Sequence, residues 1–325
     1  MSDDRPRQPK AIPFSDIDLN RWKEYDDLHT DSLWILGARD RTGPHAGDYW
    51  GNFVPQIPNQ VLRRFTRQGE VVVDLFNGMG TTLIECRHLG RHGIGVELSG
   101  DVAERANERI ALAENPHAIT TTVLTGDART EETVAAVRSE LEALGTQHAQ
   151  CVLLHPPYHN IIRFSDSPDD LSNMPSVEAF LVEFARVVDH AYALLAERRF
   201  LALVIGDMYQ RATCIPLGFR CMQVCIDRGL TLKSINVKDI QGNERGKGKS
   251  ENLWRYRALQ LGFSVFKHEY VMLFQKPKVR RKHDAPSRSV ADSSPSLPPG
   301  DVHDGDDVGP DVVGGDDSVF VVSTR

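Results

Sequence analysis

The sequence predicts an α/β fold in which helices cover both faces of an open, mostly parallel sheet. Residues 71–73 are a run of three valines that ends in Asp74, and Gly78 and Gly80 follow before helix-forming residues resume. Continuous β-branched runs of this kind are typical of parallel strands that are buried on both faces. A second apolar run, residues 151–154, ends at two prolines, and between the two runs short apolar segments alternate with helical patterns. Such alternation favours a parallel sheet with crossover helices.

Hydrophobic periodicity places the individual elements along the chain. The predicted helices span residues 59–66, 81–89, 101–113, 131–144, 176–195 and 217–228. The predicted strands span residues 71–74, 93–98, 119–125, 151–154, 201–205, 232–237 and 263–274, and residues 32–36 form either a short strand or the edge of a helix. The last of these strands is the longest.

Acidic residues follow three of the predicted strands. Asp74, Glu97 and Asp127 each stand at or just beyond a strand end, and open α/β sheets bind ligands at the carboxyl ends of their strands. Glu97 lies about twenty residues beyond the glycines, where a carboxylate can accept both hydroxyl groups of a ribose. Nicotinamide binding would require G-x-G-x-x-G at this glycine turn and a P-loop would require Gly-Lys-Ser/Thr after it, and neither pattern occurs there. The sequence therefore predicts a site for a nucleoside-like ligand.

The two prolines after residue 154 create a rigid corner at the end of a strand. Pro156 and Pro157 fix their own φ angles and supply no N–H donor, so His155 and Tyr158 are expected to be held in an exposed, stiff hook. Rigidity of this kind suits a catalytic site.

Together these motifs resemble those of the S-adenosylmethionine-dependent DNA amino-methyltransferases, which methylate adenine N6 or cytosine N4. The resemblance spans residues 32–276, with the glycine turn before the proline corner, which is the unpermuted order of the family. It implies a Rossmann-like class I methyltransferase fold with a seven-stranded, mostly parallel sheet and one antiparallel strand, residues 263–274, at an edge of the sheet. The cofactor-binding residues that it implies are Phe53, Asp74, Phe76, Gly78, Gly80, Thr81, Thr82, Glu97 and Asp127, and the catalytic residues are His155, Pro156, Pro157 and Tyr158. Phe53 would contact the methionine end of the cofactor and Asp127 its adenine amino group; packing of Phe53 between helix and sheet is an equal alternative.

In this family the exocyclic amine of the base attacks the methyl group directly. The amine is a weak nucleophile because its lone pair is conjugated into the ring, and acceptors for its protons make it more tetrahedral. The resemblance assigns this task to the side chain of His155 and the carbonyl of Pro156, and it assigns stacking on a flipped-out base to Tyr158. Methylation at cytosine C5 is disfavoured because it needs a cysteine nucleophile, commonly beside a proline, and the sequence contains no Pro-Cys pair.

His155 departs from the family pattern, which has Asp, Asn or Ser at this position. A neutral histidine has one acceptor nitrogen and a protonated one has none. His155 could instead be a structural residue at the strand end, with His159 or Asn160 supplying the acceptor. The choice between adenine and cytosine stays open. So do two other functions: methylation of an RNA base amine, or DNA binding by a catalytically inactive subunit that binds the cofactor.

The charge of the chain is unevenly distributed. The net charge of −7 matches that of residues 284–325, where nine aspartates stand against two arginines, so residues 1–283 are neutral overall. Within this neutral part, a basic cluster is expected to bind the phosphates of double-stranded DNA, although a merely solvated loop is the alternative. This cluster comprises Arg245, Lys247, Lys249, Arg255 and Arg257.

The predicted organisation is a flexible segment 1–20, a catalytic domain 21–278 and a disordered acidic tail 284–325. Residues 209–262 are the candidate target-recognition region, and because this region is small, a homodimer or a partner subunit would help to select the DNA site. The five cysteines form no Cys-x-x-Cys pair, which argues against a metal site. No apolar run approaches the ~20 residues of a membrane span, and the polar start of the chain does not resemble a signal peptide. We therefore expect a cytoplasmic protein, of the kind found in restriction-modification systems.

Overall fold

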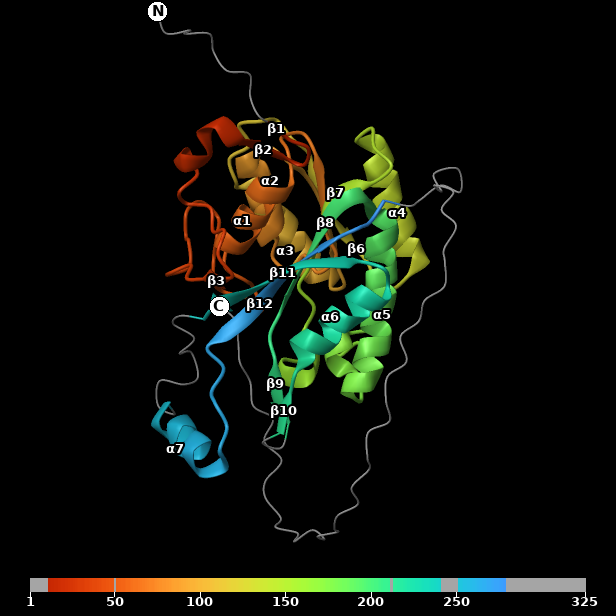
Figure 1. The fold of residues 1–325 in the computed structure, drawn as a ribbon. Coiled ribbons are helices and arrows are strands. Elements are labelled where there is room, and N and C mark those ends of the chain that lie inside the picture. The colour runs from red at the N-terminus through yellow and green to blue at the C-terminus, as the bar shows by residue number, and fades with distance from the viewer. Residues whose placement is uncertain (1–10, 50, 211–212, 241–250, 279–325) are drawn as a thin grey trace, which may run out of the picture.

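The computed structural model describes residues 11–49, 51–210, 213–240 and 251–278 of the 325-residue chain. Its core is an eight-stranded sheet with the order β3-β11-β12-β8-β7-β4-β5-β6 (Figure 1). The strands are β3 Leu33–Trp34, β4 Val71–Asp74, β5 His92–Glu97, β6 Thr121–Thr125, β7 Ala149–Leu154, β8 Leu195–Ile205, β11 Thr231–Asp239 and β12 His268–Gln275. The helices are α1 Gln56–Phe65, α2 Thr81–Leu89, α3 Gly100–Ala111, α4 Glu131–Ala143, α5 Val177–Leu194, α6 Leu217–Asp227 and α7 Glu251–Leu261. The mostly parallel sheet confirms the predicted fold class.

β12 is the strand that runs antiparallel to its neighbours. It pairs with β11 on one side and β8 on the other. The prediction that this strand forms an edge is therefore wrong: β11 covers its outer side, and the two-residue β3 pairs in parallel with β11 beyond it. β3 also makes the sheet eight-stranded rather than seven-stranded, and it resolves the ambiguity at residues 32–36 in favour of a strand.

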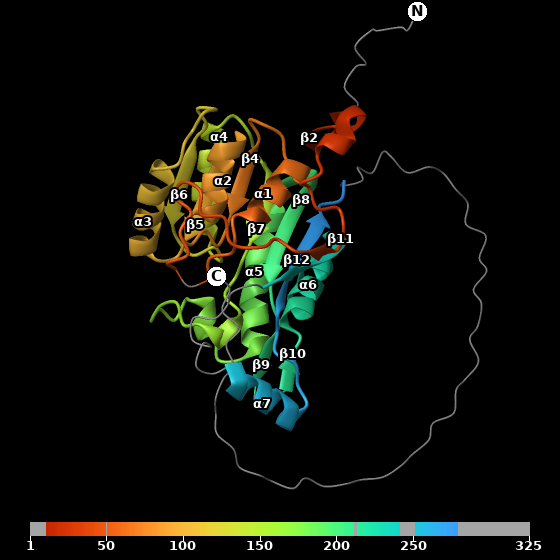
Figure 2. The same cartoon turned by 90° about the vertical axis from the view of Figure 1, so that its left-hand side faces the viewer.

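Each face of the sheet packs against its own layer of helices. Successive side chains of a strand point to opposite faces, and β4 shows this clearly: Val71 and Val73 pack with the cluster that includes α4, α5 and α6, whereas Val72 packs with α1. α2 and α3 lie over β5 and β6 on the α1 side. Figures 1 and 2 show these two layers enclosing the sheet. The β4 valines are thus buried from both sides, as the continuous apolar run predicts.

The smaller elements surround this core. A short hairpin, β1 Ala11–Ile12 and β2 Ser15–Asp18, precedes the 3-10 helix η1 Leu19–Glu24, so part of the segment predicted to be flexible is built into local structure. A second hairpin, β9 Met208–Gln210 and β10 Thr213–Ile215, follows β8. The 3-10 helices η2 His159–Ile161 and η3 Leu171–Asn173 follow the proline corner. None of the helices in the described ranges has an apolar stretch long enough to span a bilayer.

Gly80 allows the glycine turn to pass close to α3. It caps the start of α2 with φ +83°, and a Cβ atom built there would lie 2.6 Å from Cδ1 of Ile110. A side chain at this position would be costly for two reasons: positive φ disfavours L-residues, and an added Cβ would be too close to Ile110.

We expect Gly80→Ala to lower the free energy of unfolding by about 2 to 4 kcal/mol, since strain in φ adds to overpacking. Gly145→Ala is the matched control, because Gly145 has φ +77° with no atom within 4 Å of an added Cβ. Urea denaturation of both variants isolates the steric contribution. Equal losses in the two variants would show that the contact with Ile110 is not tight.

Candidate active site

The carboxyl ends of β4, β5 and β7 open into one cleft that brings the two sequence motifs together. The cleft encloses about 1080 Å³ of empty space, including solvent at its mouth. Ten of the thirteen predicted site residues line it: Phe53, Phe76, Gly78, Thr81, Glu97, Asp127, His155, Pro156, Pro157 and Tyr158. Parallel strands direct all these segments to the same edge of the sheet.

Asp74, Gly80 and Thr82 are not among the residues that line the cleft; Asp74 and Thr82 brace the glycine turn. Asp74 is buried and accepts hydrogen bonds from Oγ1 of Thr82 at 2.6 Å and from the backbone N–H of Phe76 at 3.0 Å. Burial raises the pKa of Asp74 to about 6, although these two hydrogen bonds oppose the rise. In this structure the strand-end aspartate therefore holds the turn in shape, and contact between Asp74 and a ligand stays a prediction.

Glu97 joins the end of β5 to the glycine turn. One carboxylate oxygen, Oε2, accepts the N–H of Gly78 at 3.0 Å, and Oε1 accepts the N–H of Ser99 at 3.0 Å. Burial raises the pKa of Glu97. Each oxygen keeps a further lone pair, so the acceptors on this wall fit a ribose with two neighbouring hydroxyl groups.

Asp127 is held by an arginine that sequence reasoning did not single out. Nε of Arg129 donates to both oxygens of Asp127 at 3.0 Å, and the same guanidinium bonds Glu183 at 2.9 Å. Both Asp127 and Arg129 line the cleft. Any bond from Asp127 to an adenine amino group would have to use the lone pairs that Arg129 leaves free.

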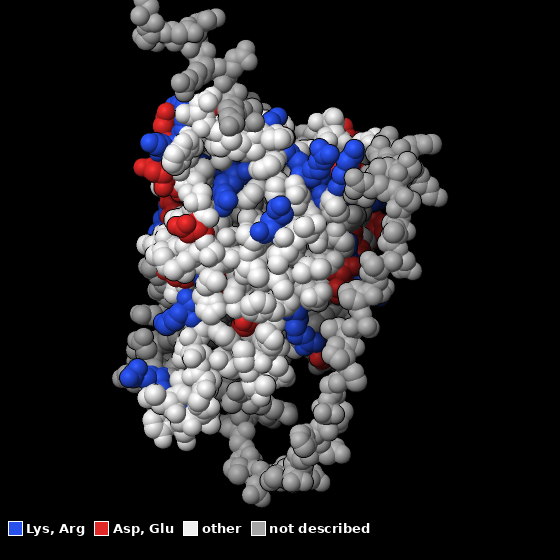
Figure 3. All heavy atoms as spheres, in the orientation of Figure 1, with Lys and Arg blue, Asp and Glu red and all other residues white. Residues whose placement is uncertain are grey.

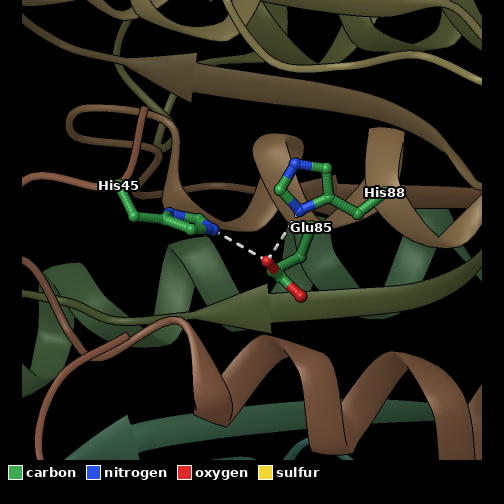
Figure 4. A group of neighbouring side chains, drawn as sticks. All are labelled: His45, Glu85 and His88. Atoms are coloured by element: carbon green, nitrogen blue, oxygen red, sulfur yellow. Dashed lines mark hydrogen bonds and ion pairs between the residues drawn. The ribbon is translucent and has the colours of Figure 1, made fainter. Parts of the chain in front are cut away.

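The segment that carries Phe53 is fixed from behind by two polar anchors. Arg39 donates to the carbonyl oxygens of Asn52 at 3.3 Å and Phe53 at 3.0 Å. The second anchor is Glu85 on α2, whose Oε1 lies 2.8 Å from Nε2 of His45 and 3.2 Å from Nδ1 of His88 (Figure 4). Sequence reasoning missed both anchors because they connect segments that are far apart in the chain.

The hydrogen bonds to Glu85 make its charge favourable despite burial. Bonds from His45, His88 and Asn59 lower its pKa from an ordinary 4.5 to about 2, against the effect of desolvation. A carboxyl group whose pKa is lowered in the folded state stabilises the fold above its ordinary pKa, and this contribution is lost as the pH falls toward the lowered value.

We expect Glu85→Gln to cost about 3 kcal/mol of unfolding free energy at pH 7, and to cost progressively less between pH 4.5 and pH 2. Denaturation at pH 7 and at pH 3 measures the difference. Glu108→Gln on the exposed side of α3 is the control and should have little effect at either pH. A loss at pH 3 as large as at pH 7 would contradict the assigned ionisation.

His155 is set into a chain of hydrogen bonds below the proline corner. Nε2 of His155 lies 3.4 Å from the hydroxyl oxygen of Tyr158, which in turn donates to Oε2 of Glu269 at 2.9 Å. The other carboxylate oxygen, Oε1, accepts from Nζ of Lys238 at 3.0 Å. Glu269 and Lys238 are buried, and the ring of Phe53 packs on that of His155 with 4.9 Å between centroids.

This environment keeps His155 uncharged at neutral pH. Desolvation is the largest influence and lowers the pKa of His155 to about 4; Glu269 opposes the shift and Lys238 adds to it. Burial and Glu269 raise the pKa of Tyr158 well above its ordinary value, so its hydroxyl keeps its proton. A neutral imidazole retains one acceptor nitrogen. His155 can therefore accept a hydrogen bond at neutral pH, which a protonated histidine could not.

The two alternative acceptors are placed differently. His159 is buried, and its Nε2 lies 2.9 Å from the carbonyl oxygen of Met174. Asn160 is exposed, and neither residue is among those that line the cleft. The geometry therefore favours His155.

The predicted basic cluster lies largely outside the described residues. Arg245, Lys247 and Lys249 fall in the segment 241–250, whereas Arg255 and Arg257 belong to α7. In Figures 1 and 2, α7 lies near the hairpin of β9 and β10, which follows β8. On the face drawn in Figure 3, most Lys and Arg side chains lie over the upper part of the molecule, and few lie near α7. The acidic tail, residues 284–325, also lies outside the described part.

Comparison with known proteins finds partial matches to DNA methylases. Residues 5–108 match the family model described as DNA methylase, of the N6 and N4 class. The Type II methyltransferase M.MjaII of Methanocaldococcus jannaschii is 36% identical over 67 residues, which is 20% of this chain and 13% of that protein. M.SmaI of Serratia marcescens is 35% identical over 85 residues, which is 26% of this chain and 28% of that protein. The matches thus span well under half of these relatives.

Among solved structures, TrmN of Thermus thermophilus superimposes with a TM-score of 0.42 at 19% identity, over 69% of this chain and 49% of that one. The family model and the Type II relatives, all of which match parts of the sequence rather than its whole length, agree with the motifs brought together in the cleft. Over these parts of its sequence the chain is similar to DNA methylases of the N6 and N4 class and to Type II methyltransferases.

Proposed function

We propose that this protein transfers a methyl group from S-adenosylmethionine to the exocyclic amino group of a base in double-stranded DNA. One observation carries the proposal: the wall formed by Gly78 and Glu97 and the corner formed by residues 155–158 line the same cleft. A methyl donor held on the first is thereby presented to a base held at the second. The match of residues 5–108 to the DNA methylase family model supports DNA as the substrate.

S-adenosylmethionine supplies an activated methyl group on a sulfonium centre when it is bound. Glu97 would accept the two ribose hydroxyl groups, and Asp127 is the candidate for the adenine edge, while the half-buried ring of Phe76 supplies an apolar wall. Phe53 packs on His155, so the residue predicted to contact the methionine end also positions the catalytic ring.

The base would be extruded from the duplex, because its amine is otherwise engaged in pairing and cannot reach an interior cleft. His155 and the carbonyl of Pro156 would accept hydrogen bonds from the amine. Tyr158 would offer its ring to the base, although its hydroxyl points to Glu269. The basic cluster that includes Arg255 and Arg257 would contact the phosphates.

The test is to incubate the full-length protein with methyl-labelled S-adenosylmethionine and double-stranded DNA or RNA of mixed sequence. After digestion, chromatography identifies the methylated nucleoside. We expect N4-methylcytosine or N6-methyladenine from DNA. Label in RNA alone would assign the alternative substrate, and cofactor binding without label in any nucleic acid would assign the inactive subunit.

A further inference from the structure

The hydrogen bonds that begin at the proline corner end in a buried ion pair. Glu269 on β12 has no exposed surface, and Lys238 on β11 is 4% exposed, yet both are ionisable and lie opposite each other on paired strands. Buried ion pairs of this kind contribute little net stability compared with well-packed apolar residues. We therefore expect the pair to have a functional role rather than a purely stabilising one.

The direction of each hydrogen bond follows from the chemistry of the groups. The carboxylate of Glu269 is bonded to Lys238, and an ionised carboxylate can only accept. The hydroxyl proton of Tyr158 is therefore committed to Oε2 of Glu269. The oxygen of Tyr158 can then only accept from Nε2 of His155, so this nitrogen carries the proton of the neutral ring. The distance of 3.4 Å between Nε2 and the hydroxyl oxygen indicates a weak hydrogen bond. Such a bond can select between the two tautomers of His155 while contributing little to the stability of the fold.

Selecting this tautomer leaves the lone pair on Nδ1 of His155. Among the described residues, none forms a hydrogen bond with Nδ1. This atom is also absent from the buried polar atoms that lack a partner, and His155 lines the cleft. The acceptor is thus available on the ring nitrogen that the protein does not use.

We propose that Glu269, held by Lys238, is a positioning residue that acts through Tyr158 to keep the lone pair of His155 on Nδ1, where it accepts a proton of the target amine. This inference rests on the proposed function. It explains how a histidine can take the place of the Asp, Asn or Ser that the family resemblance implies at this position.

The transfer balances with these groups alone. The amine nitrogen forms a bond to the methyl carbon while the bond from that carbon to the sulfonium sulfur breaks and its electron pair stays on sulfur. The extra proton of the methylated amine passes to Nδ1 of His155. A weak base suffices, because loss of this proton restores conjugation between the amine and the ring.

The experiment uses two double variants that both remove the buried charges together, so that neither leaves an unpaired ion. In Glu269→Gln with Lys238→Met, the amide oxygen can still accept the Tyr158 hydroxyl. In Glu269→Leu with Lys238→Met, no acceptor remains, and the Tyr158 hydroxyl is free to donate to Nε2 of His155. The two proteins differ in one hydrogen-bond acceptor at similar side-chain volume.

The first readout is the tautomer of His155, measured by long-range ¹H–¹⁵N NMR on protein labelled at histidine nitrogen, without substrate. His155→Gln identifies the resonance. We expect a proton on Nε2 in the wild type and in the Gln/Met variant, and a proton on Nδ1 in the Leu/Met variant. A proton on Nδ1 in the wild type, or the same tautomer in all three proteins, would overturn the inference, whether or not the protein methylates DNA.

The second readout is turnover with DNA. We expect the Leu/Met variant to lose kcat by about 10²-fold, the scale of one positioned proton acceptor, with an unchanged Kd for S-adenosylmethionine, and the Gln/Met variant to recover most of it. Equal kcat in the two variants would overturn the inference even with the expected tautomers. Failure of the proposed function appears separately, as a wild-type protein that shows the expected tautomer but methylates no base.

Discussion

Replacing His155 by alanine is expected to reduce kcat for methyl transfer by about 10² to 10⁴-fold. The variant loses the acceptor that makes the amine nucleophilic, while the carbonyl of Pro156 is retained. His155 is not among the proposed cofactor-binding residues, so binding of S-adenosylmethionine, measured by calorimetry, should change only slightly.

His155→Asn is the matched variant, because asparagine restores a side-chain acceptor at the position where the family carries Asp or Asn. We expect it to recover a substantial part of the activity that alanine loses. Asparagine does not titrate, whereas His155 with a pKa of about 4 loses its acceptor when it is protonated. Activity of the wild type should therefore fall below about pH 4 to 5, and that of the Asn variant should not show this acid limb. Full activity of His155→Ala would exclude the residue from the chemistry.

Glu97→Ala is expected to weaken binding of S-adenosylmethionine by about 10² to 10⁴-fold. Two hydrogen bonds from ribose hydroxyl groups to a charged carboxylate are each worth about 1.5 to 3 kcal/mol, and each 1.4 kcal/mol is tenfold in Kd. The variant also removes the acceptor for the N–H groups of Gly78 and Ser99, which adds to the loss by loosening the turn.

Glu97→Gln separates these two contributions, since the amide oxygen can still accept one of the two backbone bonds but carries no charge. We expect an intermediate Kd. The exposed variant Glu104→Gln controls for the change in overall charge. Calorimetry of the three proteins gives the comparison, and a Kd for Glu97→Ala within threefold of the wild type would show that the ribose is bound elsewhere.

Local sequence patterns were sufficient to predict the parallel sheet and the edge of the sheet that carries the site. Both predictions depend on hydrophobic periodicity and on the spacing of motifs along the chain. The valines of β4 and the glycines after them define a strand, a turn and a helix within twenty residues, and the structure places them so. Asp74 illustrates the limit. Its position at a strand end predicts a ligand contact, which stays a prediction. Its hydrogen bonds to Thr82 and Phe76, which support the turn, are evident only in the folded structure.

The sequence could not predict whether β12 lies at the edge of the sheet or inside it. Residues 268–275 have the composition of a buried strand, and nothing in that composition says whether one neighbour or two will pair with it. β11 occupies the outer side, and this pairing is a long-range choice made by the packing of the whole sheet.

By itself the sequence determined the α/β class, the strand-end acids and the rigid corner at residues 155–158, because strand period, glycine turns and proline geometry are local properties of the chain. Tertiary structure alone decided how His155 is used. Glu269 lies more than a hundred residues away from Tyr158 in the chain, and only the pairing of β12 with β8 brings its carboxylate beneath the corner. Burial there lowers the pKa of His155, and the direction of the hydrogen bonds assigns its lone pair, and neither effect exists until the sheet has formed.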